Sequence, residues 1–97
     1  MFVGEVIGNV WGVRKVKELE GKALLLVRPI DPVTEKPLGE AMMAIDTVGA
    51  GPGSIVLVMD EGGSARSVLG SKTAPVRTFI CGIVDSVSLR GKDKKYA

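Results

Sequence analysis

The apolar positions of the chain fall into five short segments, separated by turns rich in glycine, proline and aspartate. Runs of this length that are rich in valine, isoleucine and leucine predict β-strands. The connections between them are short, which favours antiparallel pairing of neighbours. The loop Asp31–Gly39 holds two prolines and is expected to be an exposed hairpin connection. The predicted strands are Val3–Val13, Lys22–Ile30, Glu40–Val48, Ser54–Met59 and Pro75–Leu89.

The middle strands are apolar on both of their faces. In the second strand, Leu25 and Val27 point to one face, whereas Leu24 and Leu26 point to the other. The third and fourth strands have the same pattern. In a sheet with one solvent-exposed face, apolar and polar residues would alternate along each strand. Because no long helix is expected to cover the second face, we expect other copies of the chain to cover it.

Glycine and valine alternate in the first strand, which places Gly4, Val6, Gly8, Val10 and Gly12 on one face. Glycines in such a row indicate bending or the close approach of another backbone, as in a small curved barrel. The predicted fold is therefore mainly β. We expect a small closed five-stranded antiparallel barrel that is similar to the oligonucleotide/oligosaccharide-binding barrel.

One short helix is expected between the last two main strands. Ser64 is placed to cap a helix over Ala65–Leu69, and Gly70 is placed to end it.

The glycine-rich loop Asp46–Ser54 has the look of a phosphate-binding loop but fails its requirements. A dinucleotide fingerprint needs a third glycine where Ser54 stands, and it needs a helix to follow, whereas here a strand follows. Pro52 also removes one N–H donor. The later GSKT, Gly70–Thr73, misses the phosphate-loop spacing as well. We expect no bound nucleotide and no other cofactor.

Composition excludes much of the usual enzyme chemistry. The 97 residues suit one domain, the formal charge is only +2, and the chain has no histidine, the commonest general base and metal ligand. The acidic residues stand beside turns, and no catalytic or metal-binding set is apparent. The single cysteine, Cys81, lies in an apolar run and is expected to be buried and inert. We predict a cytosolic, non-enzymatic protein without a membrane segment.

A barrel that binds single-stranded nucleic acid is the alternative. Such a barrel needs aromatic side chains beside basic residues on one face. Phe2, Trp11, Phe79 and Tyr96 are few and dispersed, so Trp11 is interpreted instead as an interface residue. The basic tail, residues 90–97, is expected to be solvated and frayed rather than an arm for nucleic acid.

Several segments in order resemble one known family. They are MFVGEVIGNVWGVRK, KALLLVRPID, AIDTVGAGPGSIVLV, GGSARSVLG, Pro75 and GIVDSV. The most specific parts are D-x-V-G-A-G-x-G at Asp46–Gly53 and S-A-R at Ser64–Arg66. The chain is similar in these parts to the EutN/CcmL family, the pentameric vertex proteins of bacterial microcompartment shells, over residues 1–89.

The resemblance implies a structural protein without chemistry of its own. Five barrels would close into a homopentamer at the corner of a carboxysome-like or catabolic shell, beside facets built from different, hexameric shell proteins. The protein would lie in the shell, with no nucleic-acid or membrane partner. A closed ring requires a heterologous interface whose rotation divides the circle.

Two segments are our candidates for the subunit interface or the central pore. The loop Val48, Gly49, Ala50, Gly51, Pro52 and Gly53 is placed near the symmetry axis, where only small residues fit, with Gly49 and Gly51 at positive φ. An ordinary turn remote from the axis is the alternative. Arg66, after the Ser64 cap, is expected to bind carbonyls or a carboxylate of a neighbour; its alternative is a plain surface arginine.

Overall fold

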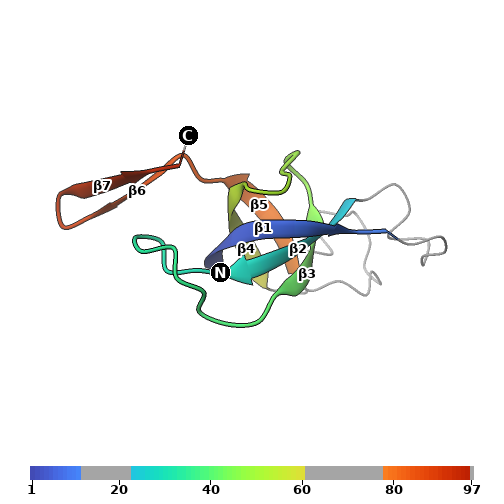
Figure 1. The fold of residues 1–97 in the computed structure, drawn as a ribbon. Helices are drawn as coiled ribbons and strands as arrows, with labels where there is room; N and C mark the ends of the chain where they lie inside the picture. Colours follow the sequence, from blue (N-terminus) through green and yellow to red (C-terminus); the bar gives the residue numbers. More distant parts are fainter. Residues whose placement is uncertain (12–22, 61–77, 97) are drawn as a thin grey trace.

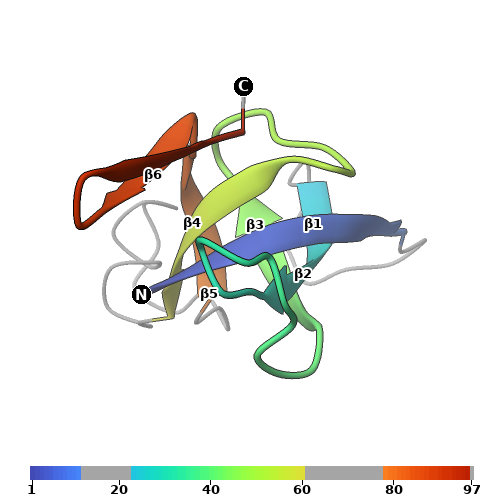
Figure 2. The same ribbon diagram turned by 60° about the vertical axis from the view of Figure 1, so that its left-hand side comes forward.

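The computed structural model describes residues 1–11, 23–60 and 78–96. Within these residues, five strands close into a barrel in the order β1-β2-β3-β5-β4, and two more pair as a separate hairpin (Figures 1 and 2). The prediction of a mainly β fold with a closed five-stranded barrel is confirmed. The strands are β1 (Phe2–Val10), β2 (Ala23–Pro29), β3 (Met42–Asp46), β4 (Ile55–Asp60), β5 (Thr78–Ile83), β6 (Ser86–Leu89) and β7 (Lys92–Lys95).

The barrel is mixed, so the prediction of an antiparallel barrel was wrong. Strand β5 lies between β3 and β4, and it runs parallel to β3 and antiparallel to β4. The reason is geometric: strand directions must alternate around an antiparallel ring, and an odd number of strands cannot alternate. A closed barrel of five strands therefore needs at least one parallel pair. The helix expected over Ala65–Leu69 falls outside the described residues.

The inner face of the barrel is filled by aliphatic side chains from all five strands. Val6, Val27, Val56, Val58 and Ile80 are the most deeply buried of them, with exposures of 1% or less. Burial of each such side chain contributes about 1.5–3 kcal/mol. This cluster holds the strands together as one unit.

A second apolar cluster lies on the outer face. Ile45 pairs with Leu24 on one side and with Phe79 on the other, and Phe79 pairs with Met59. Ile45 and Phe79 are only 2% and 5% exposed within a single chain. For these residues, the expectation that other copies must cover the second face was wrong. Met43 does stay 58% exposed on this side of the barrel.

A bulge in β1 changes which residues share a face. Val6 pairs with Val27 and Gly8 with Leu26, so that Ile7 has no partner of its own in the register. Gly8 therefore lies on the face opposite to Gly4 and Val6, and the predicted single row of glycines was wrong. The close approach of another backbone is confirmed at Gly4, because a Cβ there would lie 3.1 Å from the carbonyl oxygen of Arg28, and also 2.5 Å from Val27 Cγ1.

Cys81 occupies a similar bulge in β5. Leu57 pairs with Gly82 and Val58 with Ile80, which leaves Cys81 between the two pairs. Its thiol lies 3.5 Å from the carbonyl oxygen of Leu57, and the residue is exposed. The prediction of a buried cysteine was wrong, since alternation along β5 places the residue after the buried Ile80 on the outer face of the barrel.

The segment predicted as one long last strand is divided. Strand β5 ends at Ile83, and β6 then pairs with β7 from Ser86↔Lys95 to Leu89↔Lys92. Arg90 (φ 53°) and Gly91 (φ 79°) make a two-residue turn with both φ angles positive, as tight hairpins require. Residues 92–95 are thus an ordered strand, and the expectation of a frayed tail was wrong for them. The β6–β7 hairpin, here called the arm, points away from the barrel (Figure 1).

In the described part of the chain, no helix has the length and apolar character needed to cross a bilayer.

Candidate assembly site

The glycine loop between β3 and β4 is organised by one carboxylate. Asp46 Oδ1 accepts hydrogen bonds from the backbone N–H groups of Val48, Gly49 and Ala50 at 3.0, 3.1 and 3.2 Å. The hydroxyl of Thr47 donates to the carbonyl of Ile80 at 2.6 Å and so attaches the loop to β5. Aspartate is a common turn former for this reason, because its short side chain bonds the backbone that follows it.

The remaining donors of the loop are also used within the subunit. Gly51 N–H donates to Ser54 Oγ, Gly53 N–H to the carbonyl of Val6, and Ser54 N–H to the carbonyl of Gly51. Pro52 has no N–H to offer. From Val48 to Ser54 every backbone donor therefore has an internal acceptor. A phosphate group would have to displace these bonds, so the geometry opposes nucleotide binding here.

Two glycines of the loop need their conformational freedom. Gly49 has a φ of 82° and Gly53 a φ of 90°. The prediction is confirmed for Gly49, but it was wrong for Gly51, whose φ is not positive. A Cβ built at Gly51 meets no atom within 4 Å. Among the described residues of one subunit, nothing prevents a larger side chain at this position.

Apolar side chains remain exposed around the barrel. Ile7, Met43, Val48 and Ile83 each keep more than a third of their surface in water, and Trp11 keeps 87%. Val48 belongs to the glycine loop, and Ile7 and Ile83 lie on β1 and β5. Single exposed apolar residues are ordinary, but this set surrounds a small domain and offers surface that association would bury.

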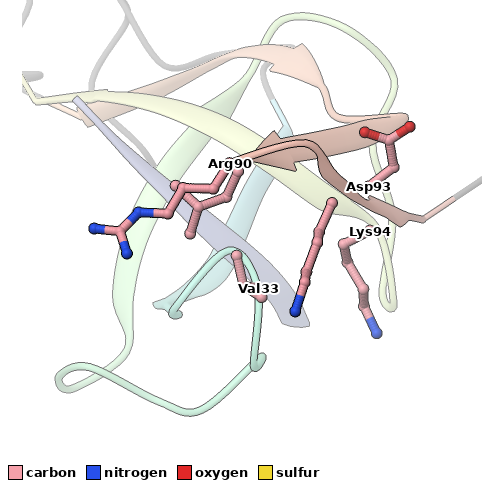
Figure 3. A pocket seen from close by; sticks show the side chains of 6 residues that line it. Val33, Arg90, Asp93 and Lys94 are labelled. Atoms are coloured by element: carbon pink, nitrogen blue, oxygen red, sulfur yellow. The ribbon is translucent and has the colours of Figure 1, made fainter.

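A cavity of about 380 Å³ lies between the arm and the turn Asp31–Lys36 (Figure 3). Val33 forms its wall on the turn, and Leu89 forms its wall on the arm. In this view Arg90 and Lys94 lie on either side of Val33, while the carboxylate of Asp93 points away from it. The residues that line the cavity are Val33, Leu89, Arg90, Lys92, Asp93 and Lys94.

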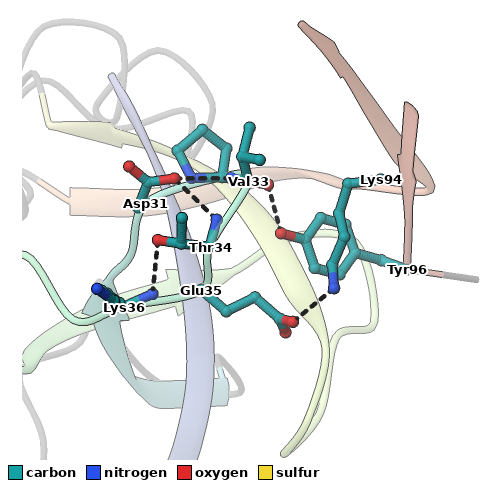
Figure 4. A network of polar contacts seen from close by, with 8 residues as sticks. Asp31, Val33, Thr34, Glu35, Lys36, Lys94 and Tyr96 are labelled. Atoms are coloured by element: carbon teal, nitrogen blue, oxygen red, sulfur yellow. Dashed lines mark hydrogen bonds and ion pairs between the residues drawn. The ribbon is translucent and has the colours of Figure 1, made fainter. Parts of the chain in front are cut away.

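Polar contacts hold the arm against this turn (Figure 4). The hydroxyl of Tyr96 donates to the carbonyl of Pro32 at 2.5 Å, and Lys94 Nζ lies 2.9 Å from Glu35 Oε2. Lys94 Nζ also lies 5.7 Å from the centre of the Tyr96 ring, within reach of a cation–π interaction. The first two contacts join the arm to the turn, whereas the third lies within the arm itself.

The carboxylate of Asp31 stabilises the turn from within. It accepts the N–H groups of Val33 and Thr34 at 2.8 and 2.9 Å, and these bonds lower the pKa of Asp31. The hydrogen bond to Glu35 raises the pKa of Lys94. Burial, with the Glu35 charge adding to it, raises the pKa of Tyr96. All three shifts favour the protonation states found at neutral pH.

The raised pKa of Tyr96 predicts how the arm responds to high pH. Its folded pKa is raised, so its contribution to stability is complete below the unfolded value of about 10 and is lost as pH rises through the folded value. A tyrosinate also cannot donate to the Pro32 carbonyl. Tyr96 is the only tyrosine, so the near-ultraviolet absorbance of tyrosinate follows this group alone. We expect a midpoint above pH 10 that returns to the ordinary value in denaturant.

Two variants that should shift the pKa of Tyr96 in opposite directions serve as controls for this titration. Glu35→Gln removes a charge that raises the pKa of Tyr96, and Lys94→Met removes one that lowers it. The midpoint should therefore fall in the first variant and rise in the second. A native midpoint equal to that of the denatured chain would contradict the contact between Tyr96 and the turn.

Sequence reasoning found only part of these features. It selected the glycine loop and its turn-forming aspartates, but it missed the arm, the cavity and the contacts of Tyr96. The two-residue turn at Arg90–Gly91 between apolar and basic segments was the available signal for the arm. Ser64 and Arg66 fall outside the described residues, so their predicted roles stay predictions. Among the described residues, no three acidic or cysteine side chains gather where they could hold a metal ion.

These features define the class of protein. It is a small β-barrel whose glycine loop satisfies its own backbone hydrogen bonds and whose exposed apolar side chains association would bury. The profile of the family described as "Ethanolamine utilisation protein EutN/carboxysome" matches residues 1–85. The chain belongs to this EutN/CcmL family. It is a non-enzymatic vertex protein of bacterial microcompartment shells, and its place is the shell.

Three relatives illustrate the likeness. The vertex protein EutN of Escherichia coli K12 is 45% identical over 92 residues, which cover 95% of each chain. GrpN of Rhodospirillum rubrum is 42% identical over 89 residues, covering 90% of this chain and 96% of GrpN. Its structure, described as a pentameric microcompartment shell protein, has a TM-score of 0.79 over 92% and 99% of the chains. The carboxysome protein CcmL of Gloeobacter violaceus has a TM-score of 0.84 at 36% identity, over 96% and 94%.

Proposed function

We propose that five copies of this chain form a closed ring that occupies the vertices of a microcompartment shell. The observation that carries the proposal is the likeness to the pentameric GrpN structure, at 37% identity over nearly the whole of both chains. The identity of 42% along the sequence supports the same mode of association. At a vertex, the outer edge of the ring contacts hexameric shell proteins, which build the facets.

A ring of identical subunits needs two different surfaces on each copy. Such heterologous contacts close when their rotation divides the circle. The exposed side chains of Ile7, Met43, Val48, Ile83 and Trp11 provide apolar surface for these contacts. Burying a side chain of this kind gains about 25 cal/mol per Å² before the cost of association is subtracted.

The loop Val48–Gly53 faces the symmetry axis in this proposal. It carries exposed backbone, two glycines with positive φ and open space at Gly51. Small residues suit a place where five copies converge. Ser64 and Arg66 belong to the subunit boundary, where the arginine binds groups of the next copy.

Native mass spectrometry of the purified chain tests the ring. A discrete pentamer is expected, and assembly should shift the emission of Trp11, the only tryptophan, to shorter wavelength as its indole leaves water. A monomer that binds oligonucleotides with a steep salt dependence would favour the nucleic-acid alternative instead. Mixing the pentamer with a hexameric shell protein should convert open sheets or tubes into closed polyhedra, seen by electron microscopy.

Gly51→Val tests the position of the loop. A valine fits there within the described part of one subunit, because no atom of that part lies within 4 Å of its Cβ and φ is not positive. The barrel should keep its thermal stability as a monomer, while the pentamer population should fall several-fold through crowding at the axis. Gly39→Val, in the loop between β2 and β3, is the matched control: its Cβ would make only an ordinary contact, 4.0 Å from Pro29 Cγ, and the variant should assemble normally. An unchanged ring for Gly51→Val would place the loop away from the axis.

A further inference from the structure

The arm is incomplete as a structural unit. It is an isolated two-stranded sheet, and such hairpins are marginally stable in water without a surface to pack against. Its anchors are near its base: Tyr96 N–H donates to the carbonyl of Asp85 at 2.7 Å, and Val84 N–H to that of Ile55 at 2.8 Å. Beyond them the arm points away from the barrel that carries it.

Its apolar face opens into the cavity rather than onto a core. Leu89 is 53% exposed and Val33, across the cavity, is 37% exposed. The space between them, about 380 Å³, is large enough for several side chains. The polar groups near it are flexible basic side chains at the rim, and they do not converge on one point as in a small-molecule pocket (Figure 3).

The arm is nevertheless held in one orientation. The hydroxyl of Tyr96 and the ammonium of Lys94 bind the turn at Pro32 and Glu35. A surface held open in advance loses less conformational entropy when a partner fills it. The contacts therefore prepare the cavity for an occupant without filling it.

Charge indicates what kind of occupant fits. Segment 90–95 carries four basic side chains and one acidic one, three positive charges net, while the whole chain is only +2. The rest of the chain is thus slightly acidic. A second copy offers both requirements at once: exposed apolar side chains on its barrel and carboxylates near them, such as Ile7 beside Glu5.

We infer that the cavity receives an apolar side chain from the barrel of the neighbouring copy, so that each arm holds the next subunit of the ring. The inference rests on the proposed pentamer, and it names one of the two surfaces that a heterologous ring requires. The basic rim pairs with carboxylates of the neighbour, and salt weakens this pairing. The arm–turn contacts position the surface.

Leu89→Asp and Ser88→Asp form a matched pair for the test. Leu89 faces the cavity, and Ser88, next to it on β6, points to the opposite face. Native mass spectrometry and light scattering should find association weakened roughly 30-fold or more for Leu89→Asp, as for a central contact residue, and unchanged for Ser88→Asp. Circular dichroism should find both barrels folded, because the inner cluster does not include the arm.

A photocrosslinking amino acid at Val33 tests contact directly. Irradiated rings of this variant should give covalent dimers to pentamers on a denaturing gel, with the attachment point on the barrel of another copy. Attachment only within the same chain, or only to an added hexameric shell protein, would overturn the inference. A pentamer that survives Leu89→Asp overturns it and leaves the proposed function standing, whereas a monomeric wild-type chain removes both.

Discussion

Replacing Gly4 with alanine is expected to destabilise the barrel by about 1–3 kcal/mol, the usual cost of overpacking a core. The added Cβ would lie 2.5 Å from Val27 Cγ1 and 3.1 Å from the carbonyl oxygen of Arg28. Val27 is fully buried on the strand that pairs with β1, and the backbone of Arg28 is fixed in the ladder. Neither neighbour can therefore move aside to relieve the clash with the added methyl group.

Gly8→Ala in the same strand is the control. Its Cβ would make an ordinary contact, 3.7 Å from Leu26 Cδ1. Loss of a glycine also lowers the entropy of the unfolded chain, so stability should be unchanged or rise by about 0.4–1 kcal/mol. Chemical denaturation of both variants at one protomer concentration makes the comparison, since association adds stability by mass action. Equal midpoints would mean that β1 and β2 lie farther apart at Gly4 than described.

Ile80→Ala should have a larger effect, about 2–5 kcal/mol. Ile80 is completely buried in the inner cluster, and its strand closes the barrel by pairing with β3 and β4. Its carbonyl also accepts the hydroxyl of Thr47 from the glycine loop. A cavity at this point therefore weakens both the inner apolar cluster and the pairing of β5 with β3 and β4 that closes the barrel. A domain of this size has about 5–15 kcal/mol of stability in total, so a substantial fraction of it would be lost.

The same truncation at Ile83 is the control, because it removes the same atoms from a more exposed position. Ile83 lies on the same strand but is 48% exposed, so Ile83→Ala should change the unfolding free energy of the separate subunit by no more than about 0.5 kcal/mol. Thermal unfolding measured in dilute solution makes this comparison. Similar losses for both variants would contradict the placement of Ile80 in the core.

The glycine-rich composition of the loop has a structural explanation that involves no ligand. The carboxylate of Asp46 accepts three N–H groups, and Gly49 and Gly53 take conformations that other residues rarely adopt. Gly51 alone is required by neither contact nor conformation within the subunit. A residue that its own subunit does not need is the best reporter of what lies next to it in the shell.

The sequence alone determined the local features of this protein. Alternation and turn residues located all five barrel strands, and the aspartates at 31 and 46 marked the turns that they stabilise. The order of the glycine loop and its neighbouring segments also indicated the family. These properties depend on residues close together in the chain, so a pattern of a few positions suffices to predict them.

Only the tertiary structure decided how the strands meet. The parallel pair of β3 and β5, the bulges at Ile7 and Cys81 and the buried outer cluster around Ile45 all depend on partners distant in sequence. One extra residue in a strand moves every later side chain to the other face, and no local pattern records where that happens. The position of the arm also depends on a distant partner, because the hydroxyl of Tyr96 donates to a carbonyl 64 positions earlier in the chain.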